Sequence, residues 1–175
     1  ALVAGPDVVT YRELDRLCSE FAGRLVLEKS LVLIESDNSV ESIVAFYGAL
    51  RKGHAVVFWE KGNDRLKTNL EAAFRPRYCY EQESGSWQLR ANESGKGHGL
   101  HDDLALLICT SGSTGSPKCA RISRENIAAN TASIVTFLEI SEDDRCLLLL
   151  PAFYCYGLSI INTHLASGAC LDVRG

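Results

Sequence analysis

Short apolar runs alternate with amphipathic helical patterns along the first 80 residues, and this alternation constrains the fold more than any other feature of the sequence. Apolar runs at residues 31–34, 55–59 and 78–80 have the length of buried strands. Between them, residues 39–52 and 63–74 carry apolar side chains at helical spacing. Strands that alternate with helices at this pace indicate βαβ units. We therefore expect an α/β fold: a mainly parallel sheet with helices on both faces and right-handed crossovers.

A helix signal also precedes the first of these runs. Thr10 can cap a helix, with Glu13 three residues later as its capping-box partner. Apolar side chains then recur at helical spacing and should face the core: Leu14, Leu17, Cys18, Phe21 and Leu25. Residues 81–101 are polar and rich in Gly and Ser, with a strand-like piece at residues 86–90, which indicates a surface hairpin or loop.

The second half of the chain continues the alternation of strands and helices. The expected elements are a strand at residues 104–109, a returning strand at 120–123, a helix capped by Ser123 that runs to about residue 138, a strand at 145–150, a loop at 151–157, a helix at 158–166 and a strand at 169–173. We divide the chain into βαβ units at residues 1–80, a polar hairpin or loop at 81–103 and a third segment at 104–175, all within one domain.

The segment after the strand at residues 104–109 is the strongest functional signal. Residues 110–118 have the sequence TSGSTGSPK. Glycine lets backbone N–H groups approach an anion without a clashing Cβ atom, and successive N–H groups in a turn form an anion-binding concavity. Hydroxyl groups and the lysine ammonium add donors and positive charge. These features predict a polyphosphate site built from Thr110, Ser111, Gly112, Ser113, Thr114, Gly115 and Lys118.

Two other interpretations of this segment fit less well. A phosphate loop of the G-x-x-x-x-G-K-[ST] type requires Gly where Pro117 stands, and Ser or Thr where Cys119 stands. The proline before the lysine also removes an N–H group that such a loop uses. A flexible Ser/Gly linker rarely follows a buried strand or ends in Pro-Lys.

Charge and hydropathy argue against several classes of partner. The formal net charge of −4 argues against nucleic acid, which usually requires a basic face. No apolar run approaches the length of a membrane span, and the N-terminus lacks the pattern of a signal peptide. His98 and His101 lie in a Gly-rich stretch, where we expect solvated side chains and no metal site. We expect neither nucleic acid nor membrane as a partner.

The seven cysteines are an odd number without C-x-x-C spacing. Cys109, Cys146 and Cys170 lie in apolar runs, where cysteine behaves as a small hydrophobic residue. We therefore expect reduced thiols, no disulfide and no zinc site, in a cytoplasmic protein. Cys119 is the exception, because the positive charge of the adjacent Lys118 favours a reactive thiolate.

The loop resembles the phosphate loop of the adenylate-forming superfamily, which includes acyl-CoA synthetases, aryl-CoA ligases, luciferases and the adenylation domains of peptide synthetases. That loop runs Ser/Thr, Gly, Ser/Thr, Thr, Gly, any residue, Pro, Lys, and residues 111–118 fill every position. Residues 10–14 resemble the T-Y-x-E-L start of an early helix of the family. Residues 38–53 resemble the segment that packs its first helix layer.

The resemblance continues after the loop with two departures. Residues 123–127 resemble the family's [ST]-H-x-N-[LI] helix start, with Arg124 in place of His. Residues 150–158 resemble its L-P-x-x-H-x-x-G-L segment, with Tyr154 in place of the His that gates or lines the acyl site. The resemblance therefore implies that Tyr154 and Gly157 bind the acyl substrate. We expect one of Tyr154 and Tyr156 to lie in the core, which leaves the other to face the acyl pocket.

The resemblance implies an AMP-forming ligase with a two-step reaction. A small carboxylic acid attacks the α-phosphorus of ATP, bound with Mg²⁺, and gives an acyl-adenylate and pyrophosphate. The thiol of CoA, or of the phosphopantetheine arm of a carrier protein, then displaces AMP. The loop would hold the β- and γ-phosphates during the first step.

The family's later motifs, for adenine, ribose, Mg²⁺ and the catalytic lysine, have no counterpart in this sequence, so we assign no catalytic residue. We therefore expect residues 1–175 to be a partial N-terminal AMP-binding domain that is inactive alone. An unpaired strand edge near residues 169–173 would favour self-association. The alternative is a non-catalytic module that binds a nucleotide or phosphate.

Overall fold

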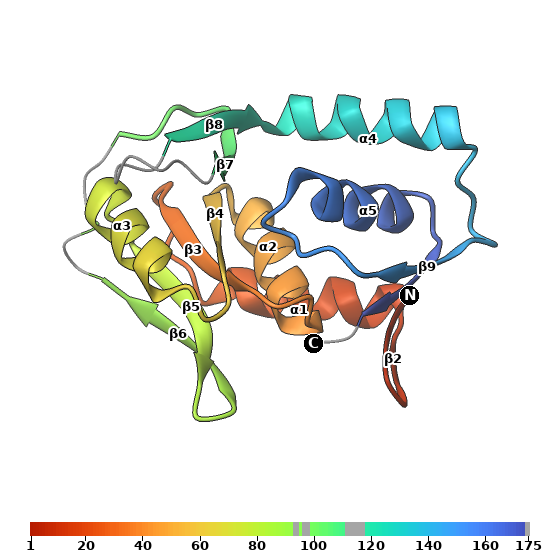
Figure 1. The fold of residues 1–175 in the computed structure, drawn as a ribbon, viewed down its shortest axis with the longest axis horizontal. Coiled ribbons are helices and arrows are strands. Elements are labelled where there is room, and N and C mark those ends of the chain that lie inside the picture. The colour runs from red at the N-terminus through yellow and green to blue at the C-terminus, as the bar shows by residue number, and fades with distance from the viewer. Residues whose placement is uncertain (93–94, 96–98, 111–117, 174–175) are drawn as a thin grey trace.

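The computed structural model describes residues 1–92, 95, 99–110 and 118–173, with the side chain of Thr110 outside this set. Within these residues the chain forms two sheets and the helices that cover them (Figure 1). The expected α/β class is confirmed, although the strands divide between two sheets where the sequence indicated one.

The larger sheet has six strands in the order β6-β5-β3-β4-β7-β8. Its inner strands β3, β4, β5 and β7 are parallel, and the outer strands β6 and β8 are antiparallel to their neighbours. Their bounds are Leu31–Ser36 for β3, Ala55–Glu60 for β4, Tyr78–Glu83 for β5, Ser86–Ala91 for β6, Leu104–Thr110 for β7 and Lys118–Ser123 for β8. The strand-like piece expected at residues 86–90 is β6, and it forms a hairpin with β5, which extends from the strand expected at 78–80 to Glu83.

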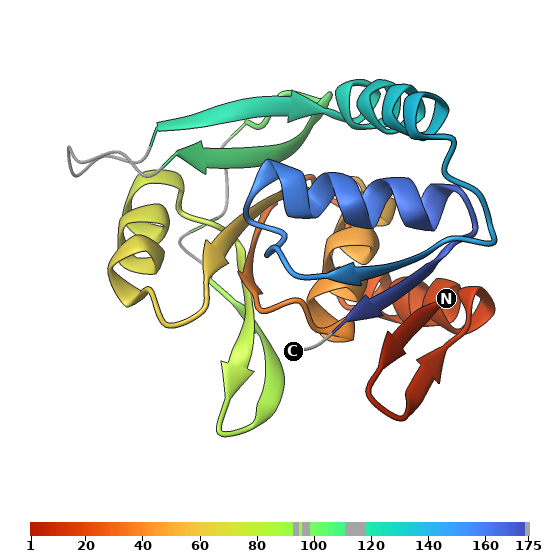
Figure 2. The same ribbon diagram turned by 45° about the vertical axis from the view of Figure 1, so that its right-hand side comes forward.

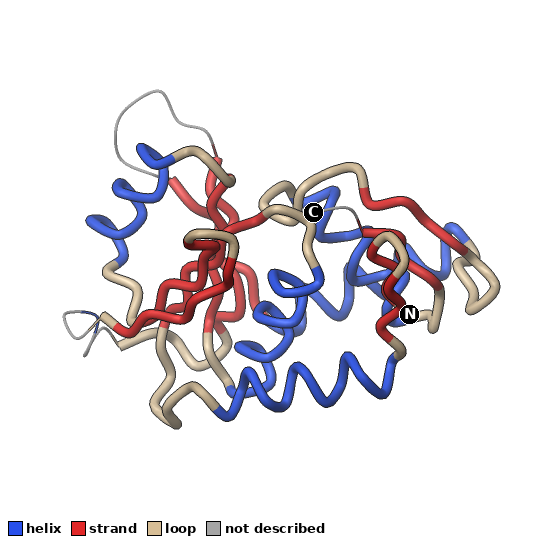
Figure 3. Tube along the Cα trace, turned by 90° about the horizontal axis from the view of Figure 1, so that it is seen from below, coloured by secondary structure: helices blue, strands red, loops and turns tan. Residues whose placement is uncertain are grey.

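Helices cover both faces of this sheet, as expected. The helices α1 (Tyr11–Gly23) and α2 (Val40–Lys52) lie on one face, and α3 (Asp64–Phe74) lies on the other (Figure 3). Alternate residues of β3 point to opposite faces, so Val32 joins the core under α2 and Leu33 joins the core under α3. All six residues of β3 are buried for this reason.

Helices α1 and α2 pack against each other at a glycine. A Cβ atom on Gly48 would lie 2.9 Å from both the Cys18 carbonyl oxygen and the Phe21 Cδ1 atom, so only glycine allows this close approach. The N-cap predicted for α1 is confirmed, because the Thr10 hydroxyl accepts a hydrogen bond of 3.2 Å from the Glu13 N–H. The helix pair forms the layer between the two sheets (Figure 1).

The smaller sheet has four strands in the order β2-β1-β10-β9, and it brings the N-terminal hairpin beside the last strand (Figure 2). The bounds are Leu2–Ala4 for β1, Asp7–Val9 for β2, Arg145–Leu148 for β9 and Cys170–Val173 for β10. β1 and β2 were not expected, because strands of three residues carry no periodicity. β10 lies between two partners, so the unpaired edge expected there belongs to β9 instead.

Two helices of the second half differ in how they are packed. α5 (Cys155–Ala166) begins three residues before its expected start and buries Leu158 and Ile161. α4 (Arg124–Leu138) begins at the predicted cap, with a capping box formed by Ser123 and Asn126. It lies beside α5 and buries none of its residues (Figure 1).

Candidate functional site

The predicted phosphate loop joins β7 to β8 at one edge of the large sheet. Thr110, the last residue of β7, lies opposite Lys118, the first residue of β8. Ser111, Gly112, Ser113, Thr114 and Gly115 lie outside the described residues. β7 and β4 are parallel, so the loop follows the carboxyl edge of the sheet, where ligands bind in open α/β folds.

A disulfide crosses the base of this loop. Cys109 and Cys119 are paired in the register of β7 and β8, and their sulfur atoms are bonded. The expectation of seven reduced thiols is therefore wrong for this pair. The physical reason is the antiparallel register, which places the two Cα atoms 3.9 Å apart although ten positions separate them in the sequence. Cys109 has the apolar surroundings that were expected for it, because it packs against the core under α3. The reactive thiolate expected at Cys119 is wrong, because its sulfur is bonded to Cys109.

Polar side chains that sequence reasoning missed gather at the same edge. The Lys61 ammonium, directly after β4, lies 3.3 Å from Oδ2 of Asp37 and donates a 3.0 Å hydrogen bond to Oε1 of Gln82. Asp37 directly follows β3. The available signal was a charged residue immediately after a buried strand. These contacts tie together the carboxyl ends of three strands.

An open hollow of about 560 Å³ lies beside this polar group. It is lined by residues 60–65, at the carboxyl end of β4 and the start of α3. Asn63 caps α3 by accepting a 3.1 Å hydrogen bond from the Leu66 N–H. The hollow therefore lies on the same edge of the sheet as the loop. It is at the end of β4, and β4 is the neighbour of β7, the strand that leads into the loop.

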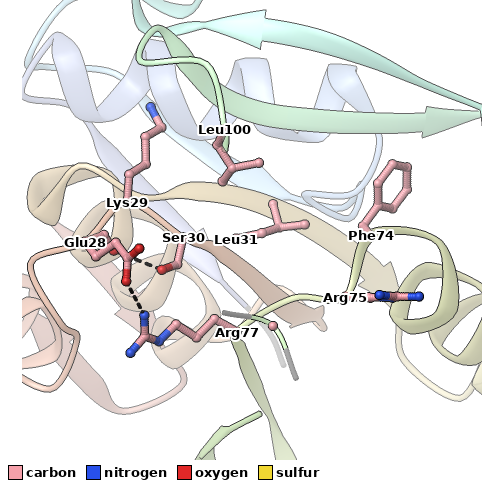
Figure 4. Close-up of a pocket in the computed structure, with 9 residues that line it drawn as sticks. Glu28, Lys29, Ser30, Leu31, Phe74, Arg75, Arg77 and Leu100 are labelled. Atoms are coloured by element: carbon pink, nitrogen blue, oxygen red, sulfur yellow. Dashed lines mark hydrogen bonds and ion pairs between the residues drawn. The ribbon is translucent and has the colours of Figure 1, made fainter. Parts of the chain in front are cut away.

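A second cavity lies at the opposite edge, near the amino end of β3 (Figure 4). Its volume of about 10 Å³ has room for no more than a water molecule. Arg77 pairs with Glu28 at 2.9 Å on its wall. The lining residues are Glu28, Lys29, Ser30, Leu31, Phe74, Arg75, Arg77, Gly95 and Leu100. Its size and position separate it from the candidate site.

The two tyrosines after β9 are both exposed. Tyr154 is 55% exposed and Tyr156 is 66% exposed, so the expectation that one of them lies in the core is wrong. The physical reason is that α5 begins at Cys155, which turns these side chains outward at its first turn. Tyr154 packs its ring against Phe153, with centroids 4.3 Å apart.

Gly157 is held in place by packing. A Cβ atom at this position would collide with the backbone carbonyl oxygens of Leu150 and Pro151. The loop before α5 folds back over the first turn of the helix, and the Tyr154 N–H donates a 3.1 Å hydrogen bond to the Pro151 carbonyl. A glycine here therefore has a structural role, whatever its contact with a substrate.

The described residues offer few groups for other chemistry. No group of three or more His, Cys, Asp or Glu side chains among them is placed to hold a metal ion. Burial raises the pKa of the Cys18 and Cys79 thiols to about 11, so neither is a nucleophile at neutral pH. None of the helices within the described part of the chain is long and apolar enough to cross a bilayer.

Residues 61–174 match the model of the AMP-binding enzyme family. The chain belongs to this family. The match contains the loop at residues 110–118 and the segment with Tyr154 and Gly157, so the AMP-binding resemblance that these residues carry is confirmed at the level of the family.

Relatives of this AMP-binding chain include the nonribosomal peptide synthetase resC of Aspergillus sclerotiorum, which is 28% identical over 99% of this chain, and this chain spans 16% of that protein. Malformin synthetase mlfA of Aspergillus vadensis is 29% identical over 99% of this chain, which spans 4% of that protein. Surfactin synthase subunit 2 of Bacillus subtilis is 26% identical over 99% of this chain, which spans 5% of that protein. The chain thus corresponds to a small part of each relative.

Solved adenylate-forming structures share the fold. VinN superimposes with a TM-score of 0.83 and 21% identity, covering 99% of this chain and 52% of VinN. The N-terminal subdomain of Klebsiella oxytoca NpsA, in complex with 3-hydroxyanthranilyl-AMSN, gives a TM-score of 0.76 and 24% identity, covering 100% of this chain and 49% of that chain. The chain spans about half the length of these structures.

Proposed function

We propose that this chain is part of a ligase that uses ATP to activate a small carboxylic acid as an acyl-adenylate, with release of pyrophosphate. The observation that carries the proposal is the family match over residues 61–174, which includes the whole of the segment 110–118. The position of that segment at the carboxyl edge of a parallel sheet supports the same proposal.

The loop supplies what the first step needs. The carboxylate oxygen forms a bond to the α-phosphorus, the bond to the bridging oxygen breaks, and negative charge builds on the departing pyrophosphate. Fixed N–H and hydroxyl donors and a positive charge stabilise that charge without transferring a proton. Thr110 is the last residue of β7 and lies opposite Lys118, the first residue of β8. These two residues would contact the phosphates from opposite sides.

The relatives favour a particular substrate and acceptor. Because the relative resC is a nonribosomal peptide synthetase, we propose an amino acid or a similar small acid as the substrate. We propose the phosphopantetheine thiol of a carrier protein as the acceptor, with CoA as the alternative. Mg²⁺ would accompany ATP. Among the described residues, no group of three or more His, Cys, Asp or Glu side chains is placed to hold this ion.

Replacing Lys118 tests the loop. In the full-length protein, Lys118→Ala should lower carboxylate-dependent ATP–pyrophosphate exchange by about 10²–10³, the usual effect of losing one preorganised donor. Arg121→Ala is the matched control, because Arg121 is an exposed cation three residues further along β8. Equal exchange in the two variants would remove the loop from the mechanism. Pyrophosphate binding without exchange would instead support a phosphate-binding module.

Replacing Tyr154 tests the acyl side of the site. Tyr154→Ala should change the KM for the carboxylic acid by about tenfold or more, the range that a pocket contact controls. The KM for ATP should stay the same. Tyr156→Ala, an equally exposed neighbour on the same helix turn, should change neither KM. A change confined to the KM for ATP would contradict the assignment of Tyr154 to the acyl pocket.

A further inference from the structure

Asn38, between β3 and α2, has an unusual backbone conformation. Its φ angle of 62° lies in the left-handed region, which few non-glycine residues adopt. Three other non-glycine residues among those described share this region: Arg75, Ser84 and Glu139. These three are exposed, and each lies in a helix cap or a turn, whereas Asn38 is only 8% exposed. A left-handed residue that is held inside the molecule indicates a specific requirement at this position.

The residues on both sides of Asn38 fix its backbone. Oδ1 of Asp37 accepts a 3.0 Å hydrogen bond from the Ser39 N–H, which closes a turn around Asn38. The Ser39 hydroxyl in turn accepts a 3.2 Å hydrogen bond from the Ser42 N–H and caps α2. The direction of the Asn38 side chain is therefore set by the end of β3 and the start of α2.

The Asn38 amide reaches across to the smaller sheet. Its Nδ2 atom donates a buried hydrogen bond of 3.4 Å to the Leu148 carbonyl oxygen, at the carboxyl end of β9. Tyr154, at the N-cap of α5, follows shortly after Leu148 in the chain. Asn38 is thus attached to the beginning of the segment that carries Tyr154, to which the proposed function assigns the acyl substrate.

A second hydrogen bond holds the other side of the same segment. The Tyr47 hydroxyl on α2 donates a 2.7 Å hydrogen bond to Oδ1 of Asn162 on α5. Tyr154 lies between Leu148 and Asn162 in the sequence, so polar contacts from one layer hold the chain before it and after it. Within the segment, the Tyr154 N–H donates to the Pro151 carbonyl and closes the turn. A displacement of Leu148 would therefore pass to Tyr154 along a short, closed turn.

The Asn38 amide oxygen indicates that stability alone does not explain this residue. Oδ1 of Asn38 is buried, and it has no hydrogen-bond partner among the described residues. A buried acceptor without a partner lowers the free energy of unfolding, and so does a left-handed backbone at a non-glycine residue. Glycine adopts this backbone conformation freely and has no amide to leave unpaired. Stability alone would thus favour glycine at this position.

We propose that Asn38 is a positioning residue for the acyl side of the site, an inference that rests on the proposed function. Its amide holds the end of β9 and, through the turn at residues 149–153, sets the place of Tyr154. A contact group that is fixed before binding loses less conformational freedom when the ligand arrives, so it binds the acid more tightly. The assigned phosphate contacts, Thr110 and Lys118, lie on β7 and β8, so ATP binding does not depend on Asn38.

Replacement of Asn38 by glycine separates positioning from stability. In the full-length protein, ATP–pyrophosphate exchange is measured with the standard amino acids, acetate and benzoate as probes, and the KM is determined for the probe that gives the fastest exchange. Asn38→Gly should raise this KM by about tenfold, within the range that contacts of one pocket control. The KM for ATP should stay the same, and the midpoint of urea denaturation should equal or exceed that of the parent. Ser84→Gly, the same change at an exposed left-handed residue, should alter neither KM.

A second variant tests the amide itself. Aspartate also tolerates the left-handed backbone, but its carboxylate cannot donate a hydrogen bond to the Leu148 carbonyl. Asn38→Asp should therefore raise the KM for the acid as Asn38→Gly does. Hydrogen–deuterium exchange of peptides from residues 148–157 should become about fivefold faster in both variants, the factor that corresponds to the loss of one typical hydrogen bond. Ser84→Gly should leave it unchanged.

Each outcome decides the inference. An unchanged KM for the acid in Asn38→Gly overturns the positioning role and leaves the proposed function standing, even if residues 148–157 exchange hydrogen faster. Equal rises in the KM for the acid and the KM for ATP also overturn it, because they indicate a general loss of structure. Absence of ATP–pyrophosphate exchange by the parent protein with every probe overturns the proposed function and the inference together.

Discussion

Residues 1–110 and residues 118–173 differ in how far their apolar side chains are buried. In the first region, β3 is buried along its whole length, and the sheet carries helices on both faces. In the second region, α4 buries no residue, although it carries apolar side chains such as Phe137, which is 84% exposed. Leu149, after the edge strand β9, is 75% exposed.

The difference shows that apolar side chains serve core packing in the first region and partly remain on the surface in the second. Most apolar residues of the first region are explained by packing in the core, which Leu158, Ile161 and Leu171 of the second region also enter. The second region, which also contains Lys118 and Tyr154, exposes apolar side chains at the end of α4 and in and after β9: Phe137, Leu138, Leu147, Leu149 and Leu150. Lys118 and Tyr154, to which the proposed function assigns the substrates, are both exposed residues of this region.

The largest expected effect contrasts one phenylalanine from each region. Phe46 is 1% exposed at the centre of the core, and Phe46→Ala should lower the free energy of unfolding by about 3–5 kcal/mol. Phe137→Ala, the matched change in α4, should alter it by no more than about 0.5 kcal/mol. Urea denaturation measures both. A large loss for Phe137→Ala would show that α4 is packed after all.

A smaller effect is expected where the second region folds back on itself. Gly157→Ala places a Cβ atom against the Leu150 and Pro151 carbonyls and should cost about 1–3 kcal/mol, as overpacking usually does. Gly23→Ala, at the end of α1 with open space around it, should be neutral or stabilising by up to about 1 kcal/mol. Thermal unfolding of the two variants checks this. Equal stability would mean that the turn before α5 is not fixed by Gly157.

The pH dependence of stability tests the first region. The buried His54 ring accepts a 2.9 Å hydrogen bond at Nδ1 from the Ser30 N–H, and Nε2 lies 3.1 Å from the Val26 carbonyl oxygen, which fits a neutral ring protonated at Nε2. Burial lowers the pKa of His54. The unfolded chain therefore takes up a proton first, so stability is full above about pH 6.5 and falls as the pH drops through the folded pKa.

Urea denaturation across this pH range measures the effect. His54→Gln should flatten the dependence below about pH 6.5, whereas His101→Gln, at an exposed position, should keep it. An unchanged slope in His54→Gln would contradict the assignment of the neutral ring to this region.

The smallest expected effect concerns association of the second region with itself. Isolated residues 1–175 should show a concentration-dependent increase in mass by light scattering, because exposed apolar residues lie in and after the edge strand β9 and at the end of α4. Phe137→Ser combined with Leu149→Ser should reduce it. Leu27→Ser is the control, since Leu27 is 86% exposed but lies in the first region. A monomer at every concentration would contradict this expectation.

Local signals made much of the fold predictable. Thr10 and Ser123 mark the starts of α1 and α4, because each side chain accepts a hydrogen bond from the N–H three residues later. The capping-box partner expected at Glu13 is not observed, since its carboxylate bonds Arg16 instead. The strand β3 stands out because its first four residues form a continuous apolar run, as expected of a strand that is buried on both faces.

Long-range pairing limited the prediction elsewhere. The second sheet depends on Leu2 lying beside Leu171, and no local pattern encodes that pair. The disulfide depends on the register of β7 and β8 across the loop. Residues 110–118 were recognisable as a candidate site from their composition. The contacts of Lys61 with Asp37 and Gln82 were not, because they join three separate strand ends.

The central claim is that this chain contributes the phosphate loop of a carboxylate-activating enzyme. Carboxylate-dependent ATP–pyrophosphate exchange by the full-length protein, measured across amino acids and other small carboxylic acids, tests that claim most directly. We predict exchange with at least one acid and its loss in Lys118→Ala, while Arg121→Ala retains it. Absence of exchange with every acid, or undiminished exchange in Lys118→Ala, would contradict the account.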